Sequence, residues 1–274
     1  MPWTKTTRRQ YRRDHLPYAS NTTDAEWLLL SFFLPAPCRV GRPREVDLRK
    51  VMDAILYILA TGCQWRALPK DFPPHTTVQY YFYAWRDQRL WRQINLALVR
   101  RARTAMGRNA IPSAGVIDSK SVKTTESGGP RGFNAAKRIK GRKRHMVTDT
   151  QGFLLAPLVH AANIQDNHGA VPVLKSLRTS FPRLRHIFAD RVYRGDKLRH
   201  AIAEFGKWTI EIVTRSENVG PFKPVPKRWG IERTFAWLGH NRRLAKDFEA
   251  TVASAEAWFL IASIRLLSHR LAKA

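Results

Sequence analysis

Apolar residues recur at helical spacing through most of the first hundred residues. Between residues 47 and 61 they stand at positions 48, 51, 52, 55, 56, 58 and 59, a stripe along one face of a helix, and Gly62 provides a stop after it. A capping box of Thr23 and Glu26 predicts the start of an earlier helix. The four expected helices cover about residues 23–34, 47–61, 76–85 and 90–105.

After residue 113 the pattern changes to short apolar runs that alternate with helical segments. The expected order is three strands, a helix, a strand, a helix, a strand and two terminal helices. This order is typical of an RNase H-like α/β fold, with a mixed central sheet and flanking helices. The expected strands cover residues 115–118, 145–149, 153–160, 186–190 and 208–213, and the expected helices about 167–179, 196–205, 226–245 and 252–271.

These patterns divide the chain into three parts. Residues 1–20 carry many basic and few apolar side chains, and we expect a flexible basic arm. Residues 21–106 are expected to form an all-α, helix-turn-helix-like DNA-binding domain, with the segment TTVQYYFYAWRD (76–87) as its groove helix. After a boundary near 107–113, residues 113–274 are expected to form the RNase H-like catalytic domain.

The charge of the chain points to a nucleic-acid partner. The 48 Lys and Arg residues against 21 Asp and Glu give a formal charge of +27, which repels itself unless a polyanion offsets it. A basic membrane-surface protein is the alternative, but no amphipathic basic helix or lipidation motif stands out. Cys38 and Cys63 lie far apart without a metal-binding pattern, and no signal peptide or membrane span is visible. We expect a cytoplasmic protein bound to double-stranded DNA.

Two aspartates share a local signature. GVID ends at Asp118 and HIFAD ends at Asp190, so each carboxylate follows a short apolar run. Functional groups gather at the carboxyl ends of strands in open α/β sheets, although Asp also ends strands simply as a turn former. For either residue alone the two interpretations weigh about equally.

Glu232 is the third acidic candidate. It is expected in the second turn of a helix, on a face with Trp229 and Phe235, where an unpaired carboxylate is costly. An ion pair with Arg228, Arg233 or Arg243 is the structural alternative to metal binding. If the three carboxylates converge, their oxygens suit two Mg²⁺ ions, or Mn²⁺ in their place, which is the chemistry of phosphodiester hydrolysis and strand transfer.

Long segments of the chain resemble the DDE transposases of bacterial insertion sequences. The amino-terminal GRPREVDLRKVMDAILYILATGCQWRALPKDFPP resembles the family's DNA-binding region, and GRKRHMVTDTQGFLLAPLVHAANIQD resembles its β-hairpin region. VIDSKSVKT, IFADRVYRG and PKRWGIERTFAWLGHNRRLAKDFE resemble the segments that carry the catalytic carboxylates. The resemblance assigns the catalytic and metal-binding roles to Asp118, Asp190 and Glu232.

The last motif departs from the family pattern at two positions. Related transposases often carry a Tyr three residues before the Arg of an Arg-x3-Glu element and a Lys or Arg seven residues after the Glu. Arg228 fits the element, but Val225 and Gly239 stand at the other two positions. We expect Arg242 or Arg243 to supply the missing basic contact to DNA.

Further contacts to DNA are expected from three places. The run KRIKGRKRH (137–145) has no acidic neighbour in the sequence, so phosphate binding is favoured over a solvated charge run. Gln79 and Arg86 of the groove helix are candidates for base contacts, while Tyr80–Tyr83 and Trp85 are assigned mainly to the core. Lys120 either touches a scissile phosphate or is a solvated lysine at a strand end. The expected DNA-binding residues are Gln79, Arg86, Lys120, Lys137, Arg138, Lys140, Arg142, Lys143, Arg144, Arg228, Arg242 and Arg243.

Asp166 is interpreted as a helix N-cap and Tyr193 as a packing residue. The resulting hypothesis is a transposase that binds the ends of an insertion sequence as a homodimer or higher assembly, with no small-molecule cofactor. Two other functions stay open. An RNase H-like nuclease would cut without joining, and a catalytically silent repressor would only bind DNA.

Overall fold

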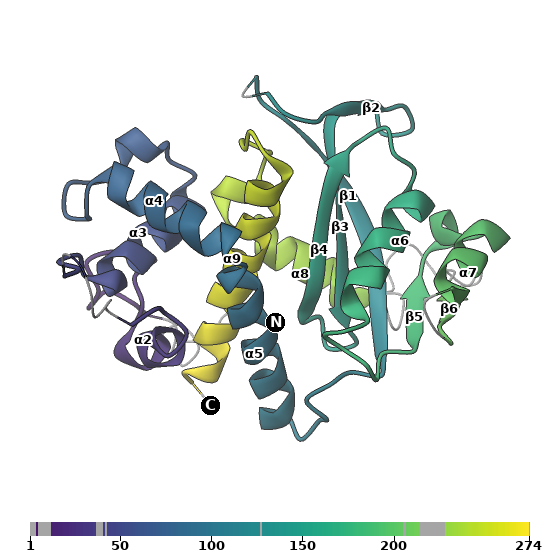
Figure 1. Cartoon of the computed structure of the whole chain (residues 1–274), viewed down its shortest axis with the longest axis horizontal. Coiled ribbons are helices and arrows are strands. Elements are labelled where there is room, and N and C mark those ends of the chain that lie inside the picture. The colour runs from purple at the N-terminus through teal and green to yellow at the C-terminus, as the bar shows by residue number, and fades with distance from the viewer. Residues whose placement is uncertain are drawn as a thin grey trace.

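The computed structural model describes residues 4, 12–36, 41, 43–126, 128–204, 207–213 and 228–273. Its first part is helical, as expected, and its second part is built on a mixed sheet (Figure 1). The helices of the first part are α2 (Asp24–Ser31), α3 (Leu48–Thr61), α4 (His75–Asp87) and α5 (Leu90–Ala105), with a short 3-10 turn at Trp65–Ala67.

Local signals set the ends of these helices. Thr23 caps α2 and Glu26 completes the predicted capping box. Asp47 caps α3, and Gly62 ends it in the left-handed conformation, with φ of 71°. A side chain at Gly62 would also press on the backbone of Arg242, 3.2 Å away. Glycine is therefore required there both for the turn and for the approach of a distant segment.

The carboxyl-terminal helix α9 (Val252–Leu271) forms part of the core of the helical region. It packs against α2, α3, α4 and α5, and also against the sheet. Trp258 of α9 stacks on Phe82 of α4, with ring centroids 4.6 Å apart, and both rings are buried. The helices of residues 24–105 are thus completed by a helix from the far end of the chain.

The sheet has six strands in a mixed arrangement. β3 pairs antiparallel with β1 on one side and with β2 and β4 on the other, while β5 and β6 continue parallel to β1. β2 was not expected from the sequence, and β1 and β3 are longer than predicted. The strands are β1 (Ala114–Lys123), β2 (Gly132–Asn134), β3 (Ile139–Asp149), β4 (Leu154–Ala161), β5 (His186–Ala189) and β6 (Thr209–Ile212).

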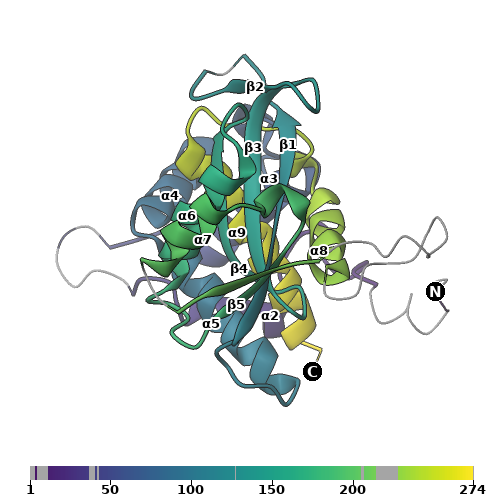
Figure 2. The same ribbon diagram turned by 90° about the vertical axis from the view of Figure 1, so that its right-hand side faces the viewer.

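Helices cover both faces of the sheet (Figures 1 and 2). α6 (Asp166–Leu177) and α7 (Asp196–Ala203) lie on one face, and α8 (Trp229–Gly239), α9 and α5 on the other. The helix predicted over 226–245 was too long, because α8 ends at Gly239 and a separate 3-10 turn, η3, covers Arg242–Leu244. Its predicted start at Pro226 lies outside the described residues.

Half of the predicted basic arm falls on residues that the structure does not describe, but its last part is anchored. Arg13 is largely buried and binds both carboxylate oxygens of Glu26 at 2.6 and 2.8 Å. Tyr18 stacks on Phe72. A flexible arm was therefore the wrong expectation for residues 12–20, because the charge of Arg13 has a buried partner in α2.

None of the helices in the described part of the chain combines the length and the apolar character that a bilayer crossing requires.

Candidate active site

Asp118 and Asp190 lie side by side where two parallel strands separate. β1 and β5 are paired at Ala114 with His186 and at Val116 with Phe188. Continuing this register by two residues sets Asp118 opposite Asp190, and period-two alternation gives both carboxylates the same face of the sheet. The sequence predicted that Asp118 ends its strand, and this was wrong. β1 continues to Lys123 as the partner of β3.

Glu232 comes from α8, the helix that packs over β1 and β3 on that same face. Its side chain is 47 % exposed, and Trp229 in the preceding turn is also 47 % exposed. The expected burial of this carboxylate on an apolar helix face was therefore wrong. Glu232 lies on the face of α8 that is exposed to solvent, whereas Ile231 and Thr234 lie on its buried face.

A single nitrogen atom connects the three carboxylates. Nη2 of Arg228 lies 3.9 Å from Oδ2 of Asp118, 3.7 Å from Oδ2 of Asp190 and 3.8 Å from Oε1 of Glu232. The three carboxylate oxygens therefore converge on one point, as the sequence predicted. The ion pair of Glu232 with Arg228, which was the structural alternative, is also present.

The electrostatics of the site leave Asp118 short of positive charge. Burial, with a smaller contribution from the negative charge of Asp190, raises the pKa of this carboxyl to about 6. The backbone N–H of Ser119 and the charges of Arg228 and Lys137 oppose the shift. Additional cationic charge at this point would stabilise the ionised form of Asp118.

The donor set fits a hard divalent cation, because three carboxylate oxygens share one open-sided point without a sulfur or nitrogen ligand. Among the residues that the structure describes, no three His, Cys, Asp or Glu side chains are closed around a ready-made metal position. Arg228 lies between the carboxylates instead.

A second polar cluster lies behind the site, on the face of the sheet that α6 covers. Asp166 accepts hydrogen bonds from the hydroxyl of Ser119 and from Lys143, so it links β1 and β3 to α6. The expected N-cap role of Asp166 was wrong, since Gln165 holds that position. Tyr193 is 2 % exposed and its hydroxyl lies 3.2 Å from Nδ1 of His145, in keeping with the predicted packing role.

Two histidine rings share the space beside Gly169 of α6. Nε2 of His145 and Nε2 of His160 are both buried without a hydrogen-bond partner among the described residues, and the ring centroids lie 4.8 Å apart. A methyl group on Gly169 would overlap both Nε2 atoms. Burial lowers the pKa of each ring, so both are neutral at pH 7.

We expect Gly169→Ala to lower the free energy of unfolding by about 1–3 kcal/mol, the usual cost of forcing atoms into a packed interior. Gly239→Ala is the matched control, because nothing lies within 4 Å of its added Cβ and the variant should be at least as stable as the parent. Urea denaturation of the two variants measures the difference. Equal stability of both would show that the histidines can move aside.

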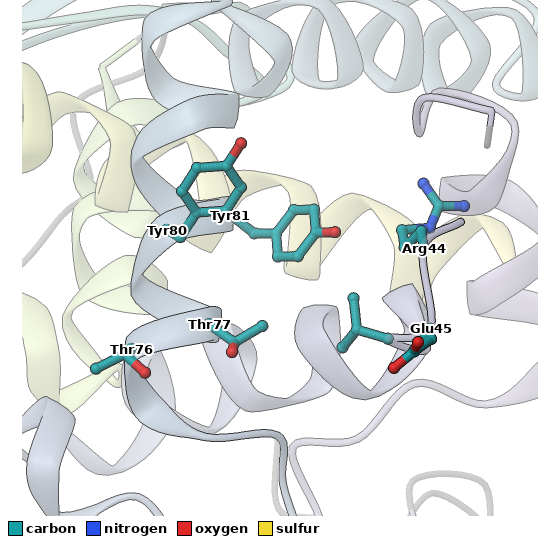
Figure 3. A pocket seen from close by; sticks show the side chains of 7 residues that line it. Arg44, Glu45, Thr76, Thr77, Tyr80 and Tyr81 are labelled. Atoms are coloured by element: carbon teal, nitrogen blue, oxygen red, sulfur yellow. The ribbon is translucent and has the colours of Figure 1, made fainter. Parts of the chain in front are cut away.

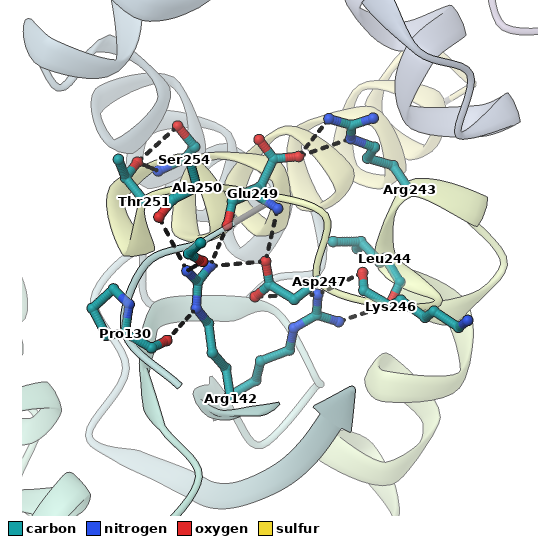
Figure 4. A network of polar contacts seen from close by, with 12 residues as sticks. Pro130, Arg142, Arg243, Leu244, Lys246, Asp247, Glu249, Ala250, Thr251 and Ser254 are labelled. Atoms are coloured by element: carbon teal, nitrogen blue, oxygen red, sulfur yellow. Dashed lines mark hydrogen bonds and ion pairs between the residues drawn. The ribbon is translucent and has the colours of Figure 1, made fainter. Parts of the chain in front are cut away.

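Three residues of the predicted phosphate-binding run are buried, which corrects the sequence interpretation. Figure 4 shows the polar network around one of them, Arg142. Arg142 is fully buried, 3.0 Å from Oδ1 of Asp247, and it donates further to the carbonyl of Glu249. Arg144 donates to the carbonyls of Leu244 and Lys246. Lys143, on the opposite face, is buried against Asp166.

The physical reason is that β3 is a central strand with helices on both faces, so its basic side chains point into two packed layers. Acidic partners come from positions more than twenty residues away: Asp166 for Lys143, and Asp247 for Arg142 and Arg144. Asp247 carries no local sequence signal, and the sequence reasoning missed it.

Two other predicted DNA contacts are also engaged within the protein. Arg243 is buried in an ion pair with Glu249, at 2.6 Å. Arg86 binds the carboxylate of Asp87 and the hydroxyl of Ser254, and so ties α4 to α9. Gln79 is half-buried and donates to the hydroxyl of Tyr83 at 3.3 Å. These contacts exclude free solvent exposure for Arg243 and Arg86.

The remaining basic candidates stay accessible. Lys137, Arg138 and Lys140 are exposed at the turn between β2 and β3, and Arg138 has a positive φ of 50°. Lys120 is exposed on β1 and, together with Gly239 of α8, lines a cavity of about 110 Å³. Arg242 is also exposed.

A second hollow lies on the surface of the helical region (Figure 3). It has a volume of about 540 Å³, and Thr76, Thr77, Tyr80 and Tyr81 of α4 line it opposite Arg44. Tyr80 is 66 % exposed, so its assignment to the core was wrong, whereas Phe82 and Trp85 are buried as expected.

Comparisons with known proteins identify the family of the chain. Residues 109–267, which include the three carboxylates, match the family described as "Transposase DDE domain", and residues 22–95 match "Putative transposase of IS4/5 family". The chain is also 35 % identical over 129 residues to a "Putative transposase for insertion sequence element IS402" of Burkholderia cepacia. That match covers 43 % of this chain and 59 % of the relative's length. The chain belongs to the transposase DDE domain family.

Proposed function

We propose that the chain is the transposase of a bacterial insertion sequence, which cuts DNA at the element ends and joins them to target DNA. The observation that carries this proposal is the convergence of Asp118, Asp190 and Glu232 within 4 Å of one atom. In this proposal the sheet with α6 to α8 is an RNase H-like core.

In the proposed reaction the three carboxylates form the two sides of the metal site. Asp118 and Asp190, set on adjacent strands, form the rigid side of the site, and Glu232 closes it from α8. Bound Mg²⁺ or Mn²⁺ would activate a water or a 3′-hydroxyl and stabilise the leaving oxygen. The cluster of half-buried Ser119 and Asp166 with buried Tyr193 holds β1 in place behind Asp118.

The accessible cations around the site are the proposed phosphate contacts. Lys120 and Gly239 line one cavity, so Lys120 stands from β1 beside the helix position where related transposases carry a basic residue. Arg242 lies just beyond the end of α8. We assign the missing basic contact to these two residues, since Arg243 is buried.

We propose that the turn between β2 and β3 is a second place where the protein binds DNA phosphates. Lys137 is close enough to Asp118 for its charge to lower the pKa of that carboxyl. Arg138 holds a left-handed backbone, which costs about 1–2 kcal/mol for a side chain of this size. The turn therefore presents three exposed cations, of which Lys137 acts on Asp118.

We expect the triple variant Lys137→Gln, Arg138→Asn and Lys140→Gln to have a lower affinity for DNA than the parent. The affinities for end DNA and for random DNA should fall by the same factor. Asn tolerates the left-handed backbone, so the turn persists. Each lost phosphate contact reduces the slope of log K against log salt by about 0.9. Titrations at several salt concentrations measure this slope.

The control is Lys175→Gln, Arg178→Gln and Arg183→Gln, an equal charge change at and beyond the carboxyl end of α6. It should leave the salt slope unchanged. An equal loss in both triple variants would show that net charge alone governs binding.

We propose that α4 reads the element ends, in a helix-turn-helix-like arrangement with α3. The accessible side of α4 carries Thr76, Gln79 and Tyr80, and the hollow beside it has Arg44 on its far wall. A helix with polar and aromatic side chains on its open face suits the major groove. Catalysis in an assembly of two or more copies on DNA is part of this proposal.

The deciding experiment incubates the protein with labelled element-end DNA, a plasmid target and Mg²⁺. We expect nicked ends and ends joined to the plasmid. Cleavage without joined products would favour the metal-dependent nuclease, and end binding without cleavage would favour the silent repressor.

A further inference from the structure

The contacts of Arg228 differ from an ordinary ion pair. Its Nη2 atom is almost equidistant from three carboxylates, at 3.7 to 3.9 Å, and touches none at hydrogen-bond distance. Its Nε atom is buried without a hydrogen-bond partner among the described residues. The guanidinium is therefore held among the carboxylates by charge and not by directional bonds.

The same point cannot hold the guanidinium and a divalent cation together. Mg²⁺ binds carboxylate oxygens at about 2.0–2.1 Å, roughly half the present distance from Nη2 to each oxygen. The three carboxylates must close inward to reach such an ion, and the guanidinium then loses its space. Two cations at one site would also repel each other.

Without any cation the site would be unstable. The side chains of Asp118 and Asp190 are only 19 % and 25 % exposed, and their Oδ2 atoms lie within 4 Å of the same nitrogen, so two like charges are held close together with little solvent between them. Arg228 supplies one positive charge to three acidic groups, so it neutralises the site only in part. A partial and loosely held counter-charge is easily displaced by a doubly charged ion.

We propose that Arg228 is a displaceable internal counter-ion, which occupies the metal position in the free protein and leaves it when divalent ions bind. This inference rests on the proposed metal-dependent function. Arg228 immediately precedes α8, so its side chain can leave without unfolding the helix that carries Glu232. Once released, the guanidinium is free to bind a DNA phosphate, so metal and DNA binding reinforce each other.

The test is a titration of the full chain with Mn²⁺ in the absence of DNA, followed by electron paramagnetic resonance of the free ion. We expect Arg228→Gln to bind Mn²⁺ about tenfold more tightly or better, since a competing charge about 4 Å from the ligands is gone. Arg228→Lys keeps a charge and should lie between the two. Arg178→Gln, an equal charge change on an exposed residue at the end of α6, should match the parent.

A second readout is the melting temperature without metal. Arg228→Gln should melt lower than the parent and gain more from added Mn²⁺, because its carboxylates lack their counter-charge. Unchanged or weaker Mn²⁺ binding by Arg228→Gln would overturn the inference, as would an unchanged melting temperature. If these results contradicted the role of Arg228 but Asp118→Asn abolished Mn²⁺ binding, the proposed metal-dependent function would stand and only the counter-ion inference would fall. If the parent bound no Mn²⁺ at all, both would fall.

Discussion

Replacing Asp118 or Asp190 by Asn, or Glu232 by Gln, is expected to abolish DNA cleavage while leaving the binding of element ends nearly intact. All three carboxylates converge within 4 Å of one atom, so removing any one breaks the same proposed metal site. Residues that act as a unit are not additive, and double variants should be little worse than single ones. Gel assays of cleavage and of binding, on the same labelled duplex, measure the two effects separately.

Asp196→Asn is the matched control for these variants. Asp196 is exposed and pairs only at the surface with Arg199, so its loss should leave cleavage at the parental rate. Full cleavage by any one of the three site variants would remove that residue from the active site.

The largest loss of stability is expected from Asp247→Ala. Asp247 is fully buried and pairs with Arg142 (Figure 4). It is also the acidic partner of Arg144, and both arginine side chains are buried. Breaking a buried pair on one side leaves an uncompensated charge and typically costs about 3–5 kcal/mol. Here two arginines lose their partner, so the upper part of that range is expected in urea denaturation.

Glu126→Gln is the control, because the Glu126–Arg131 pair is exposed and should leave the unfolding midpoint nearly unchanged. Arg142→Met adds a second check. It should destabilise the fold without reducing the salt slope of DNA binding, which separates a structural arginine from a phosphate contact. A stable Asp247→Ala protein would contradict the assigned role of this network.

Local signals accounted for much of the fold. The capping box at Thr23 and the left-handed Gly62 depend on residues within one helical turn, and both were predictable from sequence. The apolar runs before Asp118 and Asp190 predicted two strands. Their side-by-side position follows from parallel pairing, which the order of elements already implied.

Long-range partners were not predictable in the same way. The run 137–145 looked unpaired because Asp247 is about a hundred residues away and nothing near it marks it as a partner. The packing of α9 among the helices of residues 24–105 was also missed, since hydrophobic periodicity identifies a buried face but not the surface that covers it. For the site, the sequence predicted which carboxylates meet but not the central place of Arg228.

The most direct test of the central claim replaces one non-bridging oxygen of the scissile phosphate by sulfur. If Asp118, Asp190 and Glu232 bring metal ions to that phosphate, sulfur should suppress cleavage in Mg²⁺, which prefers oxygen, and the softer Mn²⁺ should restore it. The unmodified duplex should be cut in Mg²⁺ and in Mn²⁺. Neither duplex should be cut after the metal ions are chelated with EDTA. Equal cleavage of both duplexes in Mg²⁺, or cleavage in excess EDTA, would contradict the proposed site.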